Sequence, residues 1–80
     1  MKTFPLTIAK VDEALFRGDA ASMIVPGVEG EMTILAEHTP LISPLKKGAI
    51  TVRTPEGTEL FFEANGGMLE VSRGLVTVLL

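Results

Sequence analysis

The amino-acid sequence predicts an all-β fold, a small sandwich or flattened barrel of eight to ten short, mainly antiparallel strands. Val, Ile and Thr supply 20 of the 80 residues, and these branched side chains favour extended backbone. Eight glycines and five prolines divide the chain, beyond residue 18, into pieces that are too short for a helix of average length. Because 80 residues have room for one hydrophobic core, we expect a single domain over residues 1–80.

The first half of the chain predicts short strands separated by turns. Leu6-Thr7-Ile8 alternates apolar and polar side chains, as a strand does. Residues 12–17 have good helix propensity, but we expect a turn near Asp12-Glu13 and then a second strand that leads into Gly18. Further strands are expected at residues 22–25, 31–35 and 41–42.

The second half predicts a meander of four strands. Residues 49–53 and 58–64 form a hairpin, because Pro55 and Gly57 suit the turn between them. Leu60, Phe62 and Ala64 then face the core. Two further turns are expected, at Asn65-Gly66-Gly67 and at Ser72-Arg73-Gly74, and they lead into strands at residues 68–71 and 75–80, of which the last is apolar on nearly both faces.

Composition excludes several classes of function. The net charge is -3 with one histidine, so no basic stripe is available to bind nucleic acid. The absence of cysteine excludes disulfides, thiolate nucleophiles and cysteine-based metal sites. No apolar run approaches the roughly 20 residues of a membrane span, and the N-terminus lacks the features of a secretory signal, so we expect a cytosolic protein.

Hydrophobic residues make up 46% of the chain, and the mean hydropathy is +0.39. A domain of this size buries only roughly 60% of the surface that its unfolded chain exposes. We therefore expect part of the apolar surface to contact a partner. Residues 1–40 carry three basic and six acidic side chains, which predicts an acidic patch on the turns of the first half.

Three segments have alternative readings. Glu29, Glu31 and His38 could form a metal or acid–base site, although a solvated acidic turn fits the flexible Gly30 better. Gly66-Gly67 could bind phosphate, but no helix follows it. Lys46-Lys47-Gly48 could be the modified-lysine turn of a lipoyl or biotinyl carrier domain, although those carriers place a single lysine beside Asp or Met at a hairpin tip.

Five motifs together resemble one known family. Residues 25–35 (VPGVEGEMTIL), 38–42 (HTPLI), 45–48 (LKKG), 66–71 (GGMLEV) and 76–79 (VTVL) are similar, in order and at compatible spacing, to the N-terminal β-sandwich domain of the epsilon subunit of the F-type rotary ATP synthase. The chain departs from the family in having Lys10-Val11-Asp12-Glu13 in place of a Thr-Pro-Glu-like turn. The sequence also stops at Leu80, where most relatives continue into a C-terminal helical hairpin, so it is either a shortened form or one of the family members that consist of the sandwich alone. The family's ATP-binding and inhibitory functions reside in that hairpin.

The resemblance implies a non-catalytic rotor subunit in the central stalk, which links the gamma subunit to the c-ring and couples proton or sodium translocation to ATP synthesis. It implies no cofactor, metal or catalytic residue, a monomer when isolated, no insertion into the membrane, and a peripheral location on the cytoplasmic face of the plasma membrane. The residues carried over are Gly27, Glu29, Gly30 and Glu31 for the edge that faces the c-ring, and His38, Thr39, Pro40, Leu41 and Ser43 for the edge that faces gamma.

Overall fold

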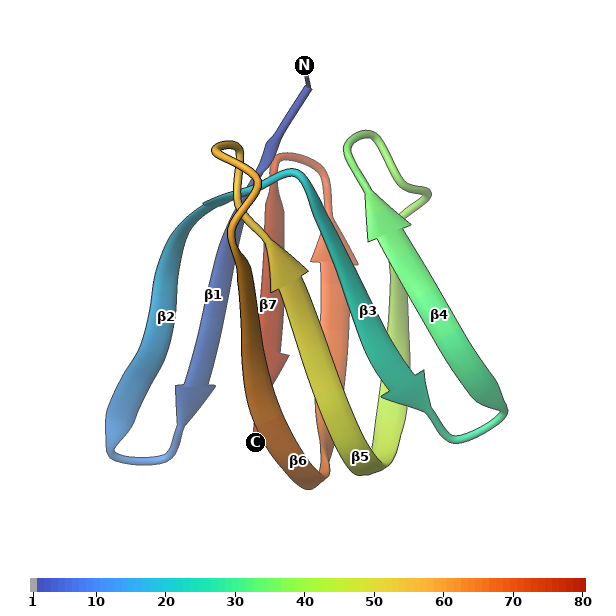
Figure 1. Cartoon of the computed structure of the whole chain (residues 1–80). Helices are drawn as coiled ribbons and strands as arrows, with labels where there is room; N and C mark the ends of the chain where they lie inside the picture. The colour runs from blue at the N-terminus through green and yellow to red at the C-terminus, as the bar shows by residue number, and fades with distance from the viewer. Residues whose placement is uncertain (1) are drawn as a thin grey trace.

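The computed structural model describes residues 2–80, and every regular element in that range is a β-strand. The strands form one hydrogen-bonded sheet of seven strands in the order β2-β1-β7-β6-β5-β3-β4 (Figure 1). Neighbours are antiparallel except for β1 and β7, which confirms the predicted all-β class. Their bounds are β1 (Phe4–Lys10), β2 (Glu13–Ala20), β3 (Ser22–Gly27), β4 (Gly30–Leu35), β5 (Leu41–Arg53), β6 (Glu59–Ser72) and β7 (Leu75–Leu79).

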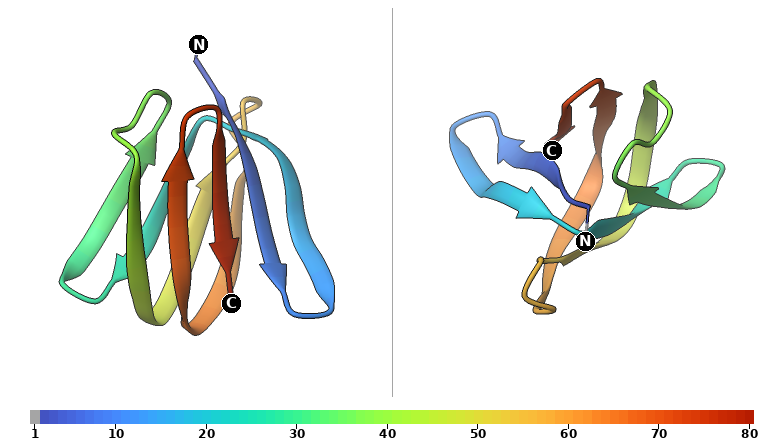
Figure 2. Two further views of the ribbon diagram at one scale, coloured as in Figure 1. Left: turned by 180° about the vertical axis from the view of Figure 1, so that it is seen from behind. Right: turned by 90° about the horizontal axis from the view of Figure 1, so that it is seen from above.

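The single sheet folds over on itself because β5 and β6 are long and bend together. The first half of β5 pairs with the second half of β6 from Leu41↔Val71 to Leu45↔Gly67, and the pairing then continues to Arg53↔Glu59. The second half of β6 pairs with β7, whereas the second half of β5 pairs with β3. The result is a sandwich of two layers (Figure 2).

We name the layers as they lie in Figure 1. The rear layer contains β2, β1, β7, the second half of β6 and the first half of β5. The front layer contains the first half of β6, the second half of β5, β3 and β4.

The bend corrects two sequence predictions. Asn65-Gly66-Gly67 is no turn between strands but part of β6, and the predicted pieces on either side of it are one strand. The strands predicted at residues 41–42 and 49–53 are likewise one strand, because β5 runs without interruption through Lys46 and Lys47. The expected count of eight to ten strands is therefore wrong, because β5 and β6 keep the same register on both sides of the bend.

Alternating side chains fill the space between the layers. Leu69 and Val71 of β6 and Val76 and Val78 of β7 are buried, and the buried residues are all apolar within the part of the chain described. Ala64 is buried and both Leu60 and Phe62 pack against the core, which confirms the predicted inward face of the hairpin.

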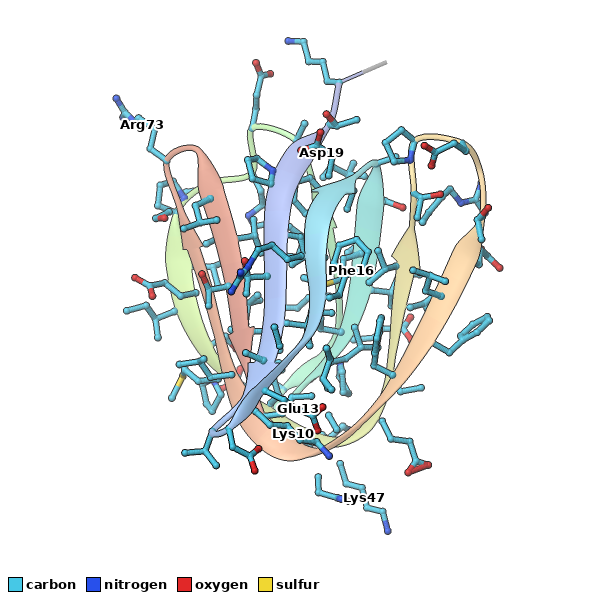
Figure 3. All side chains as sticks on the ribbon, turned by 90° about the vertical axis from the view of Figure 1, so that its left-hand side faces the viewer. Lys10, Glu13, Phe16, Asp19, Lys47 and Arg73 are labelled. Carbon is cyan, nitrogen blue, oxygen red and sulfur yellow. The ribbon has the colours of Figure 1, made fainter. Side chains whose placement is uncertain are left out.

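An aromatic pair closes one open side of the sandwich. The expected turn and second strand near Asp12-Glu13 are confirmed, because β1 and β2 form a hairpin. Phe16 of β2 lies against Phe62 of β6 with ring centroids 6.3 Å apart and an edge-to-face angle of 67° (Figure 3). Such pairs contribute about 0.5–1.5 kcal/mol beyond the apolar area that they bury.

We predict that Gly67→Ala destabilises the fold far more than Gly57→Ala. Both glycines have positive φ, 145° and 93°. A Cβ at Gly67 would lie 2.5 Å from the carbonyl oxygen of Leu79, whereas at Gly57 it would meet no atom within 4 Å. We expect the free energy of unfolding, measured by urea unfolding, to fall by about 3 kcal/mol in Gly67→Ala and by about 1 kcal/mol in Gly57→Ala. Equal losses would contradict the close approach of β6 to β7.

Phe61 and Phe62 are adjacent but should differ in their contribution to stability. Phe61 is 66% exposed, while Phe62 packs against the core and Phe16. Phe62→Ala should lower the free energy of unfolding by about 2–3 kcal/mol, and Phe61→Ala by no more than about 0.5 kcal/mol. Thermal unfolding followed by far-UV circular dichroism compares them, and the reverse ranking would show that the register of β6 is wrong.

Candidate functional site

The turn between β3 and β4 holds the residues expected to face the c-ring. Gly27 pairs with Gly30 across a two-residue turn, and a Cβ at Gly27 would lie 2.7 Å from the carbonyl oxygen of Gly30, so the narrow turn requires glycine there. Glu29 and Glu31 are exposed beside it. The amide of Val28 donates to the carbonyl of Pro44 at 3.3 Å, which anchors the turn to β5.

Lysines lie next to this acidic turn. Gly27 pairs with Leu45, so Lys46 and Lys47 follow directly on the neighbouring strand. Figure 3 shows Lys47 at the same end of the sandwich as Lys10 and Glu13. The expected acidic patch is therefore a surface of mixed charge, because β5 brings cations from the second half of the chain to the turns of the first half.

The loop between β4 and β5 holds residues expected to face gamma. The amide of His38 donates to the carbonyl of Leu35 at 3.2 Å, and the ring Nδ1–H donates to the carbonyl of Thr39 at 2.9 Å. Glu37 has a positive φ of 66°, and its carboxylate pairs with Lys2 at 2.9 Å. The loop is tied at both sides by these short contacts.

The two predicted sets of residues lie at opposite ends of β4 (Figure 1). His38, Thr39 and Pro40 line a hollow of about 620 Å³ at the end that carries Arg73. Ser43 belongs with the other set, because it lines a hollow of about 430 Å³ together with the turn from Gly27 to Met32. Six extended residues span roughly 20 Å, so β4 separates the two ends.

This separation removes the geometry of a metal or acid–base site. Glu29 and Glu31 lie at one end of β4 and His38 at the other. No group of three metal-binding side chains occurs in residues 2–80. The carrier alternative fails as well, because Lys46 and Lys47 lie within β5 and not at a hairpin tip.

An exposed apolar surface lies on the rear layer, and its position was not predicted from the sequence. Strand pairing aligns Pro44, Met68, Leu79 and Ala9 in one row across the outer face of the rear layer. Ile42 lies one row further along β5 and is 70% exposed. Alternation along each strand signals such a face, but only the pairing of four strands distant in sequence assembles the row.

The chain is similar to one known protein family and to individual proteins of that family. The family described as ATP synthase, Delta/Epsilon chain, beta-sandwich domain matches residues 3–80. The ATP synthase epsilon chain of Psychrobacter sp. (strain PRwf-1) is 43% identical over 79 residues, which are 99% of this chain and 57% of the relative. That of Bordetella avium (strain 197N) is 46% identical over 80 residues, 99% and 56% of the respective chains. The chain thus spans little more than half the length of these relatives.

Solved structures agree in fold. One similar chain comes from a structure of OSCP, F1 and c-ring of the Euglena gracilis mitochondrial ATP synthase. It superposes with a TM-score of 0.91 at 26% identity, and the match covers 96% of the present chain and 49% of the Euglena chain. A chain of the Tetrahymena thermophila mitochondrial ATP synthase central stalk and c-ring gives 0.82 at 14% identity, with 98% and 63% covered, and shows the fold alone. No helix within residues 2–80 is long and apolar enough to span a membrane. The match over residues 3–80, together with the two-layer sandwich, shows that the chain belongs to the ATP synthase delta/epsilon family and comprises its β-sandwich domain.

Proposed function

We propose that this chain is the sandwich domain of a non-catalytic subunit in the central stalk of an F-type ATP synthase, where it links the gamma subunit to the c-ring. In this role it couples ion translocation to ATP synthesis on other chains, at the cytoplasmic face of the plasma membrane. The exposed apolar row on the rear layer carries the proposal, because Met68 and Leu79, which are 41% and 55% exposed and paired side by side, form the kind of apolar patch that is typical of a protein interface. Family membership supports it.

The turn from Gly27 through Glu29 and Gly30 to Glu31 is proposed to face the c-ring. Its carboxylates are exposed and the turn is anchored to Pro44 by one hydrogen bond, so it presents charge on a stiff support. Charges arranged in this way set register and specificity more than affinity. Lys46 and Lys47 extend the same surface and allow it to meet acidic as well as basic groups.

His38, Thr39, Pro40 and Leu41 are proposed to face gamma, whereas Ser43 lies with the turn that is proposed to face the c-ring. Leu41 and Ser43 are half-buried, whereas Ile42 between them points outward from the rear layer. The structure therefore favours Ile42 as the side chain of this segment that gamma would contact, with Thr39 and Pro40 exposed beyond it.

We predict that Glu31→Lys uncouples the enzyme more than Glu63→Lys. Both carboxylates lie on the outer face of the front layer, at its opposite edges. Only Glu31 adjoins the proposed c-ring turn, where a reversed charge costs about 2 kcal/mol or more, against less than about 1 kcal/mol for an isolated surface charge. Proton pumping and ATPase activity of reconstituted synthase compare the variants at low and high salt. Equal coupling in both would exclude the turn from the c-ring contact.

Binding to gamma should depend on Ile42. We expect Ile42→Asp to weaken binding of the complete subunit to gamma at least about tenfold, which corresponds to about 1.4 kcal/mol. Phe61→Asp is the matched control, because Phe61 is 66% exposed on the opposite, front layer and should bind gamma normally. Isothermal titration calorimetry measures both affinities. If Phe61→Asp is the weaker binder, gamma contacts the front layer and the assignment is wrong.

A further inference from the structure

The two layers have four strand edges, and three of them are blocked. Pro44 lies on the edge of β5 in the rear layer, and its carbonyl is occupied by Val28. The edges of β2 and of the first half of β6 face each other across the Phe16–Phe62 contact, and the β1–β2 ladder is interrupted by a bulge. Proline, bulges and covering side chains are the usual protection of strand edges. The edge of β4 has none of these.

Pro26 decides which backbone groups of β4 are free. Pro26 pairs with Glu31 but has no N–H, so these two residues cannot exchange two hydrogen bonds. In an antiparallel ladder, bonded and non-bonded pairs alternate. The residues of β4 that are bonded to β3 are therefore Gly30, Met32 and Ile34. The N–H and C=O groups of Glu31 and Thr33 therefore point away from the sheet, as does the N–H of Leu35.

Within residues 2–80 these outward groups have no hydrogen-bond partner, apart from the carbonyl of Leu35, which accepts from His38. A row of free donors and acceptors at strand spacing is a template for another strand.

The side chains along this edge define what could bind there. Glu31 is exposed and forms none of the ion pairs found in residues 2–80, and Leu35 is 54% exposed on the same face. On the inner side, Met32 lines the hollow of about 430 Å³ that Ile42 also lines. An added strand would thus meet a carboxylate and an apolar group outside and, inside, a hollow to which Met32 and Ile42 contribute apolar side chains.

We propose that the edge of β4 binds an extended segment of a partner protein by antiparallel β-strand addition. The segment has Lys or Arg opposite Glu31, an apolar residue opposite Leu35, and a small apolar residue opposite Met32 that enters the hollow. This inference does not depend on the stalk function. A second copy of the chain fits poorly, because two strands of six residues give an interface far below the roughly 1,200 Å² of stable complexes, and each copy carries a net charge of -3.

The test uses the ¹⁵N-labelled chain and the peptide acetyl-Lys-Val-Leu-Thr-Val-Lys-amide, whose final lysine pairs with Glu31 in the proposed register. We expect saturable shifts of the amide signals of Glu31, Thr33 and Leu35 below about 1 mM peptide, and amide exchange at these positions slowed at least about tenfold. The amides of Met32 and Ile34, already bonded to β3, should change little in exchange. The control peptide carries N-methyl groups on its second, fourth and sixth residues and should not bind.

Thr33→Pro removes an outward N–H and leaves the hydrogen bonds to β3 intact, so it should abolish binding, while Thr33→Ala should retain it. If Thr33→Pro does not fold, the N-methylated peptide alone decides. Shifts elsewhere, equal binding of the methylated peptide, or no saturation would overturn the proposal. Protection of the same amides that rises with protein concentration in the absence of peptide would identify a second copy as the occupant and also overturn it.

Discussion

The pairing of β5 with β6 in a single register is the constraint on which the rest of the structure depends. The two strands keep that register from Leu41↔Val71 to Arg53↔Glu59, on both sides of the bend at which the sheet turns back on itself. Glycine permits the bend, since Gly66 and Gly67 both have positive φ, 102° and 145°, a conformation that other residues rarely adopt. β7 attaches to one side of this bent ribbon and β3 to the other, and the remaining strands extend the sheet from these two, so the bend determines which strands share a layer.

The bend also determines how the surface is divided. It places Lys46 and Lys47 beside the turn that carries Glu29 and Glu31, which gives one end of the sandwich mixed charge. It brings β5 into the rear layer, where Pro44 joins the apolar row formed with β6, β7 and β1. An apolar sheet face and a charged end are thus presented in different directions, an arrangement that suits the proposed position between two partners.

Three features suit the proposed role as an interaction domain. The acidic turn and His38 lie at opposite ends of β4, the buried side chains described are apolar, and large apolar side chains such as Ile42 remain exposed. Burial of these side chains against a partner would contribute roughly 25 cal/mol per Å². Membership of the ATP synthase delta/epsilon family is consistent with such a domain.

The sequence by itself determined the all-β class, the hairpin around Pro55 and Gly57, the inward face of Leu60, Phe62 and Ala64, and the resemblance to the epsilon subunit, because alternation and turn residues are local signals. The prediction of a turn at Asn65-Gly66-Gly67 was wrong. Glycine permits both a turn between two strands and a bend within one strand, and only the pairing with β5 shows that this segment is a bend. The apolar row, the lysines beside the acidic turn and the free edge of β4 were decided by the tertiary structure alone. Each depends on pairing between residues far apart in the chain, which no local pattern specifies.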